Sequence, residues 1–363
     1  MTTTLEKLIL ALPDKDWDWK YISSNSNITL KFISKNFKLP WNWNRVSKNT
    51  NLTMNFILEN LDKDWNWKRL SKNSSLSIND ISTNTNLPWV WNFVSINLNL
   101  TMDFIIANMD KLWNWEYISE NPNITMDDIS ANMNLPWDWG LVSNNHNLNI
   151  DFILANLDKD LDWDFISQNP NFNIRIILEN LKLPWNWYCI SSSNSSITAD
   201  DILANLDLPW EWGWVVNMPM SLILALPNKD WSWYYISKSS LIIMDDVFEN
   251  IDKPWDFGQL SHNPNLNIDF ILANLDKDWD WKVISSNPNL TIDDILKLPN
   301  KELNWQYISE NPNLTVEFVL ENLDKEWNWN SMSHNLFNKD PHLIKKYNLP
   351  DNKRKFHKFK GIL

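Results

Sequence analysis

The chain has few of the residues from which most functional sites are built. It holds one cysteine, five histidines and four glycines in 363 residues. A single cysteine excludes a disulfide framework and a multi-cysteine metal site, and scarce glycine excludes the loops that cradle phosphates. The histidines lack metal-ligand spacing, and Asp14-x-Asp16-x-Asp18 opens like a calcium loop without its glycine and closing acid. We therefore expect no catalytic, cofactor or metal site, and a protein that is not an enzyme.

Long apolar runs are also missing. No stretch is long enough to cross a bilayer, and the apolar run near the start is too short for a signal peptide. These features predict an intracellular protein with no membrane partner.

Positive charge is scarce outside the C-terminal end. The net charge of the chain is −13, but residues 336–363 hold eight Lys and Arg against two Asp, a net of +6 that leaves about −19 for the rest. Because nucleic-acid affinity depends on cations that neutralise phosphates, the acidic body is a poor nucleic-acid surface. Any polyanion should bind the basic tail, at Lys353, Arg354, Lys355, Lys358 and Lys360.

The abundant residue is tryptophan, and its spacing is regular. Trp-x-Trp begins at Trp17 and returns every 24 residues through Trp137, and the same period, with one longer and one shorter step, continues to Trp327. Of the 26 tryptophans, 25 fall in these pairs, and Trp214 is the exception. A fixed period of this length is typical of a repeat architecture.

Each repeat predicts two short helices. The first should run from Trp17 to Ser23, opened by Asp16 or by its counterpart Pro40. Its apolar residues surround the helix axis, and only Lys20 and Ser23 are expected to face solvent. A turn rich in Asn follows, and Thr29 should cap a second helix that ends near Asn36. Neither helix can bury its apolar face alone, so the repeats must stack.

The predicted fold is therefore all-α, a single elongated α-solenoid of about 14 two-helix, 24-residue repeats. The period breaks once, and LILALPNKDWSWYYIS after the break closely repeats LILALPDKDWDWKYIS near the start. The predicted parts are the first half of the solenoid at 1–212, an irregular junction at 213–221, the second half at 222–335, and a basic tail or cap at 336–363.

The repeat resembles a known pattern. The stretches NPNITMDDISANMNLPWDW (121–139) and NPNLTIDDI (287–295) are similar to the repeats of tandem Trp-x-Trp proteins from mimivirus-like giant DNA viruses. The resemblance covers residues 1 to about 335. It implies a viral repeat protein, in the host cytoplasm or the virion, and it supplies no catalytic residue or function to transfer.

One position varies more than the others. The fourth residue after the first residue of each pair, which we call the variable row, differs widely in size and polarity. Tyr, Trp and Arg, which are enriched in interface hot spots, recur there. This row predicts a partner-binding surface, and the alternative is packing between repeats with a tolerant rim. The candidate binding residues are Tyr21, Arg45, Arg69, Phe93, Tyr117, Phe165, Trp214, Tyr235 and Tyr307.

The function that this sequence favours is non-enzymatic binding of host or viral proteins by a repeat scaffold. One alternative is a helical-repeat nucleic-acid-binding protein that reads one base per repeat, although the acidic body argues against it. The other alternative is a structural component of the virion.

Overall fold

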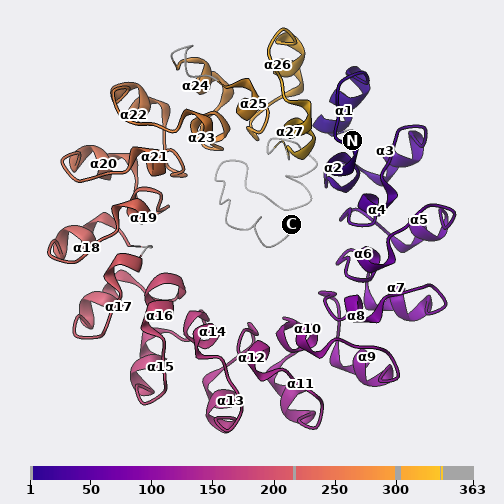
Figure 1. The fold of residues 1–363 in the computed structure, drawn as a ribbon, viewed down its shortest axis with the longest axis horizontal. Coiled ribbons are helices and arrows are strands. Elements are labelled where there is room, and N and C mark those ends of the chain that lie inside the picture. Colours follow the sequence, from indigo (N-terminus) through magenta and orange to yellow (C-terminus); the bar gives the residue numbers. More distant parts are fainter. Residues whose placement is uncertain (1–2, 216–217, 299–303, 336, 338–363) are drawn as a thin grey trace. The chain divides into compact units, whose positions relative to one another are not determined.

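The computed structural model describes residues 3–215, 218–298, 304–335 and 337. This part of the chain is helical throughout and contains no strand. It is an all-α repeat solenoid, as the period predicts. Each of its 14 repeats pairs an outer helix with a helix that begins in the Trp pair, which we call the Trp helix (Figure 1).

The outer helices carry the apolar residues that follow the Asn-rich turn. They are α1 (Thr4–Ala11), α3 (Leu30–Lys35), α5 (Met54–Leu58), α7 (Ile78–Thr83), α9 (Met102–Ala107), α11 (Met126–Ala131), α13 (Ile150–Ala155), α15 (Ile174–Glu179), α17 (Ala199–Ala204), α18 (Met220–Ala225), α20 (Met244–Glu249), α22 (Ile268–Ala273), α24 (Ile292–Leu296) and α26 (Val316–Glu321).

The Trp helices are α2 (Trp19–Ser24), α4 (Trp43–Val46), α6 (Trp67–Ser71), α8 (Trp91–Val94), α10 (Trp115–Glu120), α12 (Trp139–Val142), α14 (Trp163–Gln168), α16 (Trp187–Ser193), the 3-10 helix η1 (Trp212–Trp214), α19 (Trp233–Ser237), α21 (Phe257–Leu260), α23 (Trp281–Ser286), α25 (Trp305–Ile308) and α27 (Trp329–His334).

The chain forms two compact units. Unit 1 combines residues 1–65 with residues 266–363, and unit 2 is residues 66–265. Within each unit the Trp helices lie along one edge of the stack and the outer helices along the other. The predicted junction falls inside unit 2, where η1 replaces the usual α-helix and Glu211 makes no side-chain cap. Of the predicted tail, only Phe337 belongs to the described residues, so its lysines and Arg354 lie outside them.

The Trp helix begins later than the sequence analysis expects. It starts at the second tryptophan, and the residue between the two tryptophans is its N-cap. Asp18 is extended, and its carboxylate accepts from the backbone N–H groups of Lys20 and Tyr21. The prediction that Asp16 or Pro40 opens the helix is wrong, because the first tryptophan lies in a tight turn, with its N–H bonded to the Lys15 carbonyl.

The outer helix begins and ends as expected, but its end has a different geometry. Thr29 caps it with its hydroxyl, and Asn36 closes it at φ −131°, outside the left-handed region. The Asn36 side chain donates to the backbone carbonyl of Phe32 at 2.8 Å. The backbone carbonyl of Asn36 accepts from the indole Nε1–H of Trp41, also at 2.8 Å. One asparagine thus satisfies a free helix carbonyl and anchors the next tryptophan.

A buried serine joins each Trp helix to the next repeat. Ser119 Oγ accepts from the backbone N–H of Asp138 at 2.9 Å, and the equivalent Ser143 also donates to the Trp139 carbonyl at 2.9 Å. Ser23, which the sequence analysis places facing solvent, is fully buried in the same role. That prediction was wrong because helix periodicity alone does not show which neighbour covers a polar face.

A buried asparagine makes the strongest link between repeats. Asn145 Nδ2 donates to the carbonyls of Ser119, Asn121 and Ile124 in the preceding repeat, each at 3.1 Å. Its Oδ1 accepts from the N–H of Asn147 at 2.9 Å, and Asn147 Nδ2 also reaches back to the preceding repeat. We call this pattern the asparagine ladder. It accounts for part of the high asparagine content, which is about one residue in seven.

The last described repeat stacks on the first within unit 1 through the same contacts. Asn25 Nδ2 donates to the carbonyls of Ser333 and Asn335, and the Asp18 N–H donates to Ser333 Oγ at 3.0 Å. Trp17 packs edge-on against Trp329 at 5.2 Å, and α2 contacts α27. The first repeat is therefore covered by the last, as an internal repeat is covered by its predecessor.

We predict that Asn145→Ala lowers the free energy of unfolding by about 3 kcal/mol, because it leaves buried backbone groups without partners. Asn144→Ala is the matched control, since Asn144 is adjacent and exposed, and it should change stability by less than about 0.5 kcal/mol. Urea unfolding measures both. Equal, small effects would contradict the ladder.

Asn25→Ala tests the contact between the first and last repeats. The Asn25 side chain donates to the carbonyls of Ser333 and Asn335. Asn25→Ala should therefore lower the free energy of unfolding by at least half as much as Asn145→Ala does, about 1.5–3 kcal/mol. If the first repeat were instead uncovered in solution, Asn25 would have no acceptor in a preceding repeat, and the same urea experiment would show almost no change.

Candidate interaction face

The Trp pairs form the core of the stack. The first tryptophan of each pair is generally buried, and Trp137 is 7% exposed. The second packs edge-on against the first tryptophan of the next repeat, as Trp115 does on Trp137 at 5.2 Å. The Trp91 ring has two further contacts: it stacks on Phe104, and Lys111 Nζ lies 5.6 Å from its ring centroid. The Trp pairs are therefore packing residues of the stack.

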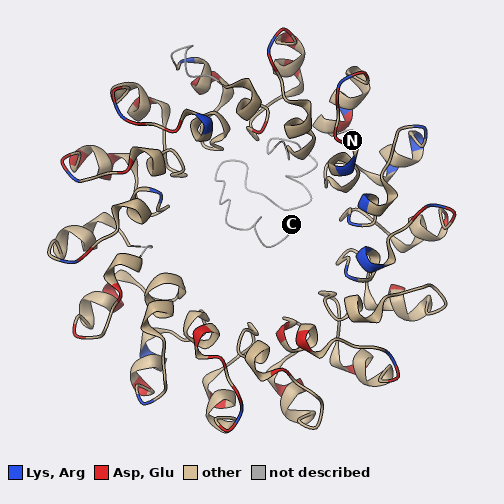
Figure 2. Cartoon of the chain, in the orientation of Figure 1, with Lys and Arg blue, Asp and Glu red and all other residues tan. Residues whose placement is uncertain are grey.

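The side chains that vary between repeats project from the Trp helices. The variable row is mostly half-buried. The residue before it, which we call the exposed row, is exposed in most repeats, as at Lys20, Lys68, Glu116 and Lys282. Figure 2 shows that charge along this face changes sign in unit 2, from Lys68 and Arg69 on α6 to Glu116 on α10 and Asp164 on α14.

The predicted binding residues lie one per repeat along the Trp helices. Tyr21 and Trp214 are the two that are exposed, at 43% and 39%. Two pairs come together: the Arg45 guanidinium lies 5.8 Å from the Tyr21 ring centroid, and Trp214 lies 5.3 Å from Tyr235. The half-buried residues are Arg45, Arg69, Phe93, Tyr117, Phe165, Tyr235 and Tyr307.

A continuous cluster of aromatic rings crosses three repeats of unit 2. The ring centroids of Tyr188 on α16 and Trp214 on η1 lie 5.1 Å apart. Trp214 in turn contacts Tyr235 on α19, and the centroids of Tyr235 and Tyr234 lie 5.1 Å apart. Tyr188 is 44% exposed and Tyr234 48%. These four residues form what we call the aromatic cluster.

The sequence analysis missed half of this cluster. Tyr188 and Tyr234 belong to the exposed row, and no other residue of that row is aromatic. That signal was available from the sequence. Their contact through Trp214 was not, because it depends on the short η1 at the junction.

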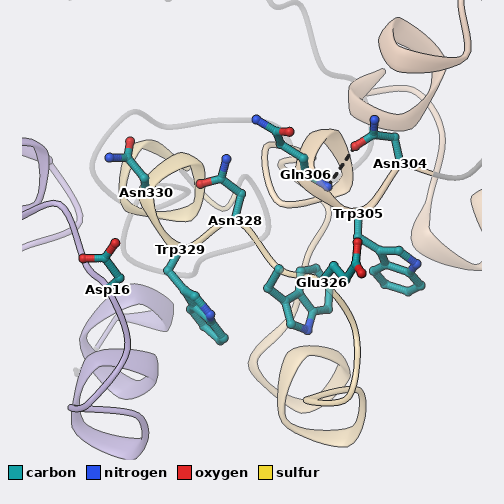
Figure 3. Close-up of a pocket in the computed structure, with 9 residues that line it drawn as sticks. Asp16, Asn304, Trp305, Gln306, Glu326, Asn328, Trp329 and Asn330 are labelled. Atoms are coloured by element: carbon teal, nitrogen blue, oxygen red, sulfur yellow. Dashed lines mark hydrogen bonds between the residues drawn. The ribbon is translucent and has the colours of Figure 1, made fainter.

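A second feature of the face is a groove between the N-terminal ends of successive Trp helices. In unit 1 it has a volume of about 550 Å³ and is lined by tryptophan edges, by the amides of Asn304 and Gln306, and by the carboxylates of Asp16 and Glu326 (Figure 3). The Asn304 side chain already makes one hydrogen bond, because its Oδ1 accepts from the Gln306 backbone N–H at 3.0 Å. An equivalent groove of about 400 Å³ lies in unit 2 between α10 and α12.

The groove can accept hydrogen bonds and attract cations. In the described ranges, no three His, Cys, Asp or Glu side chains come close enough to hold a metal ion. The helices of the same ranges include none that is long and apolar enough to cross a membrane.

Burial shifts the pKa of two groups near the face, the Cys189 thiol and the His334 imidazole, toward the neutral form. Burial raises the pKa of the Cys189 thiol, which keeps it protonated, while a hydrogen bond from Gln168 opposes this shift. Burial also lowers the pKa of His334, against the attraction of Asp18 and Glu310. His334 lies beside the Tyr21 ring, at the contact between the first and last repeats. Neither group has a partner arrangement that would activate it as a nucleophile or base.

Comparison with known proteins returns no match to this chain: no family model, no curated protein and no solved structure is similar to it. The function must therefore be argued from the face itself.

We predict that stability separates the core tryptophans from the aromatic cluster. Trp137→Ala empties a buried site and removes an indole hydrogen bond to the Asn132 carbonyl, so it should cost about 3–5 kcal/mol. Trp214→Ala removes an exposed ring and should cost under roughly 1 kcal/mol. Thermal or urea unfolding of the two variants decides this, and equal losses would show that Trp214 is core.

Proposed function

We propose that this protein is a non-enzymatic, protein-binding repeat scaffold and that the face of its Trp helices is the binding surface. The observation that carries the proposal is the aromatic cluster. Its rings touch one another, three of the four are more than a third exposed, and Tyr and Trp are the residues that dominate interface hot spots.

The frame behind the face supports the same proposal. Serine and asparagine hydrogen bonds hold successive Trp helices together through buried positions, so the exposed and variable rows can change without disturbing the stack. A rigid support with variable side chains loses little conformational entropy on binding. Repeat scaffolds commonly bind partners along such surfaces.

The origin of the protein is a separate part of the proposal. Its NPNIT…LPWDW pattern supports a protein of a giant DNA virus that engages host or viral proteins, in the host cytoplasm or in the virion. The acidic body disfavours nucleic acid as the ligand of the Trp-helix face, because acids repel phosphates.

Affinity enrichment tests the proposal. The tagged full-length protein is incubated with lysate from host-type cells, with and without nuclease, beside a Trp214→Ala/Tyr234→Ala variant. We expect proteins that the wild type captures despite nuclease and that the variant loses, since truncating hot-spot aromatics costs about 2 kcal/mol or more in binding. The matched control is Phe248→Ala, because Phe248 is a 69% exposed aromatic on the outer helix α20.

Two results would contradict the proposal. Capture that disappears with nuclease would mean that nucleic acid is the ligand. Capture that survives in the Trp214→Ala/Tyr234→Ala variant but fails in Phe248→Ala would move the binding surface to the outer helices.

A further inference from the structure

Aromatic residues of the Trp-helix face repeatedly carry a cation over the ring. Arg45 lies over Tyr21, Lys282 lies 5.9 Å from the Tyr307 centroid, and Lys68 and Lys72 lie 5.7 Å and 5.8 Å from that of Phe93. These contacts use the ring quadrupole, whose negative face attracts cations.

The aromatic cluster departs from this pattern at two of its four rings. Lys238 Nζ lies 4.6 Å from the Tyr234 centroid and 4.8 Å from that of Tyr235. Among the described residues, no Lys or Arg lies over Tyr188 or Trp214. These two rings touch each other, and Trp214 also contacts Tyr235. Both are more than a third exposed, so part of each ring remains open to solvent.

Three carboxylates lie on or beside the elements that carry the same two rings. Asp164 lies next to α16, where its Oδ1 accepts from Asn186 Nδ2 at 2.7 Å. Glu211 is exposed at the start of η1, and Asp230 is exposed just before Trp231, which packs on Trp212.

Two nearby lysines lie over rings, keep their charge and offset part of this border, but its three carboxylates outnumber them. Lys229 Nζ lies 4.4 Å from the centroid of Trp212, and Lys238 lies over the two tyrosines. The edge of the cluster at Tyr188 and Trp214 is therefore aromatic in its centre and acidic around it.

We infer that this edge binds an arginine-bearing segment of a partner protein. The inference rests on the proposed function and names the chemistry of its partner. A planar guanidinium can stack on the Trp214 indole while its N–H groups donate to a carboxylate such as Glu211, a combination that the compact ammonium of lysine matches less well. An acidic or phosphorylated segment would meet the carboxylates and be repelled.

Peptide binding to the purified full-length protein tests the inference. The probe is a fluorescein-labelled 12-residue peptide of alternating Arg and Ser, compared with peptides that carry Lys, Gln or Glu in place of Arg, and fluorescence anisotropy is read at about 150 mM salt, where the Debye length is about 8 Å. We expect the Arg peptide to bind most tightly, the Lys peptide several-fold more weakly, and the Gln and Glu peptides at least about tenfold more weakly.

Variants locate the site. Tyr188→Ala/Trp214→Ala should weaken the Arg peptide at least about tenfold, and Trp214→Leu should weaken it too, because leucine keeps an apolar contact but has no π-face. Glu211→Gln should weaken it several-fold with the rings intact. Phe248→Ala is the control and should leave binding unchanged. Unaltered melting of each variant confirms that the fold is retained.

Four outcomes would overturn the inference. Equal binding of the Arg peptide to the wild type and to Tyr188→Ala/Trp214→Ala would assign it to the general acidity of the body. Full affinity in Trp214→Leu would mean that the edge takes an apolar group instead. Failure of the Arg peptide, while lysate proteins are still lost in the Trp214→Ala/Tyr234→Ala variant, would overturn the inference and leave the proposed function standing. If the Arg peptide fails to bind and the Trp214→Ala/Tyr234→Ala variant captures the same lysate proteins as the wild type, both the inference and the proposed function are overturned.

Discussion

The structure depends on one buried asparagine side chain in most repeats. A primary amide is the one neutral side-chain group that both donates twice and accepts twice, and this asparagine uses both capacities. Its NH₂ group reaches carbonyls of the preceding repeat, and its oxygen holds the next turn of its own loop. A buried polar group of this kind is stabilising only when it is fully paired, so each asparagine fixes the register of two repeats at once.

The Trp pairs depend on a second contact, at the end of the outer helix. There a backbone carbonyl, such as that of Asn132, accepts from the indole N–H, which lets a large ring be buried without an unpaired donor. The edge-on contacts between tryptophans of successive repeats then fill the space between the helices. Asparagine sets the spacing of the repeats, and tryptophan contributes the apolar area that stabilises them. The regular pattern is interrupted where η1 replaces a Trp α-helix and where, in the next repeat, Ser239 takes the place of the ladder asparagine. The aromatic cluster lies there.

Much of the fold could be predicted from the sequence because it is local. The period, the Thr29 cap and the helix end at Asn36 each follow from a residue and its near neighbours. The role of Ser23 could not, because its acceptor and donor belong to different repeats and periodicity describes a single helix. The contact between Asn25 and Ser333 was equally hidden, since 308 residues separate the two. The variable row was partly informative: it included Trp214 and Tyr235 but not Tyr188, whose place in the cluster depends on the geometry of the junction.

Amide hydrogen exchange, measured residue by residue, tests the buried asparagine and serine acceptors most directly. The backbone N–H of Asn123 lies in a loop and donates to the side chain of the ladder asparagine Asn121. The backbone N–H of Asp138 lies before a helix and donates to Ser119 Oγ in the preceding repeat. Neither amide belongs to a helix, so these side-chain acceptors are what can slow its exchange. If the buried asparagine and serine side chains hold the stack together, both amides exchange as slowly as those of the adjoining helices. Exchange at the rate of an unstructured peptide would contradict the account.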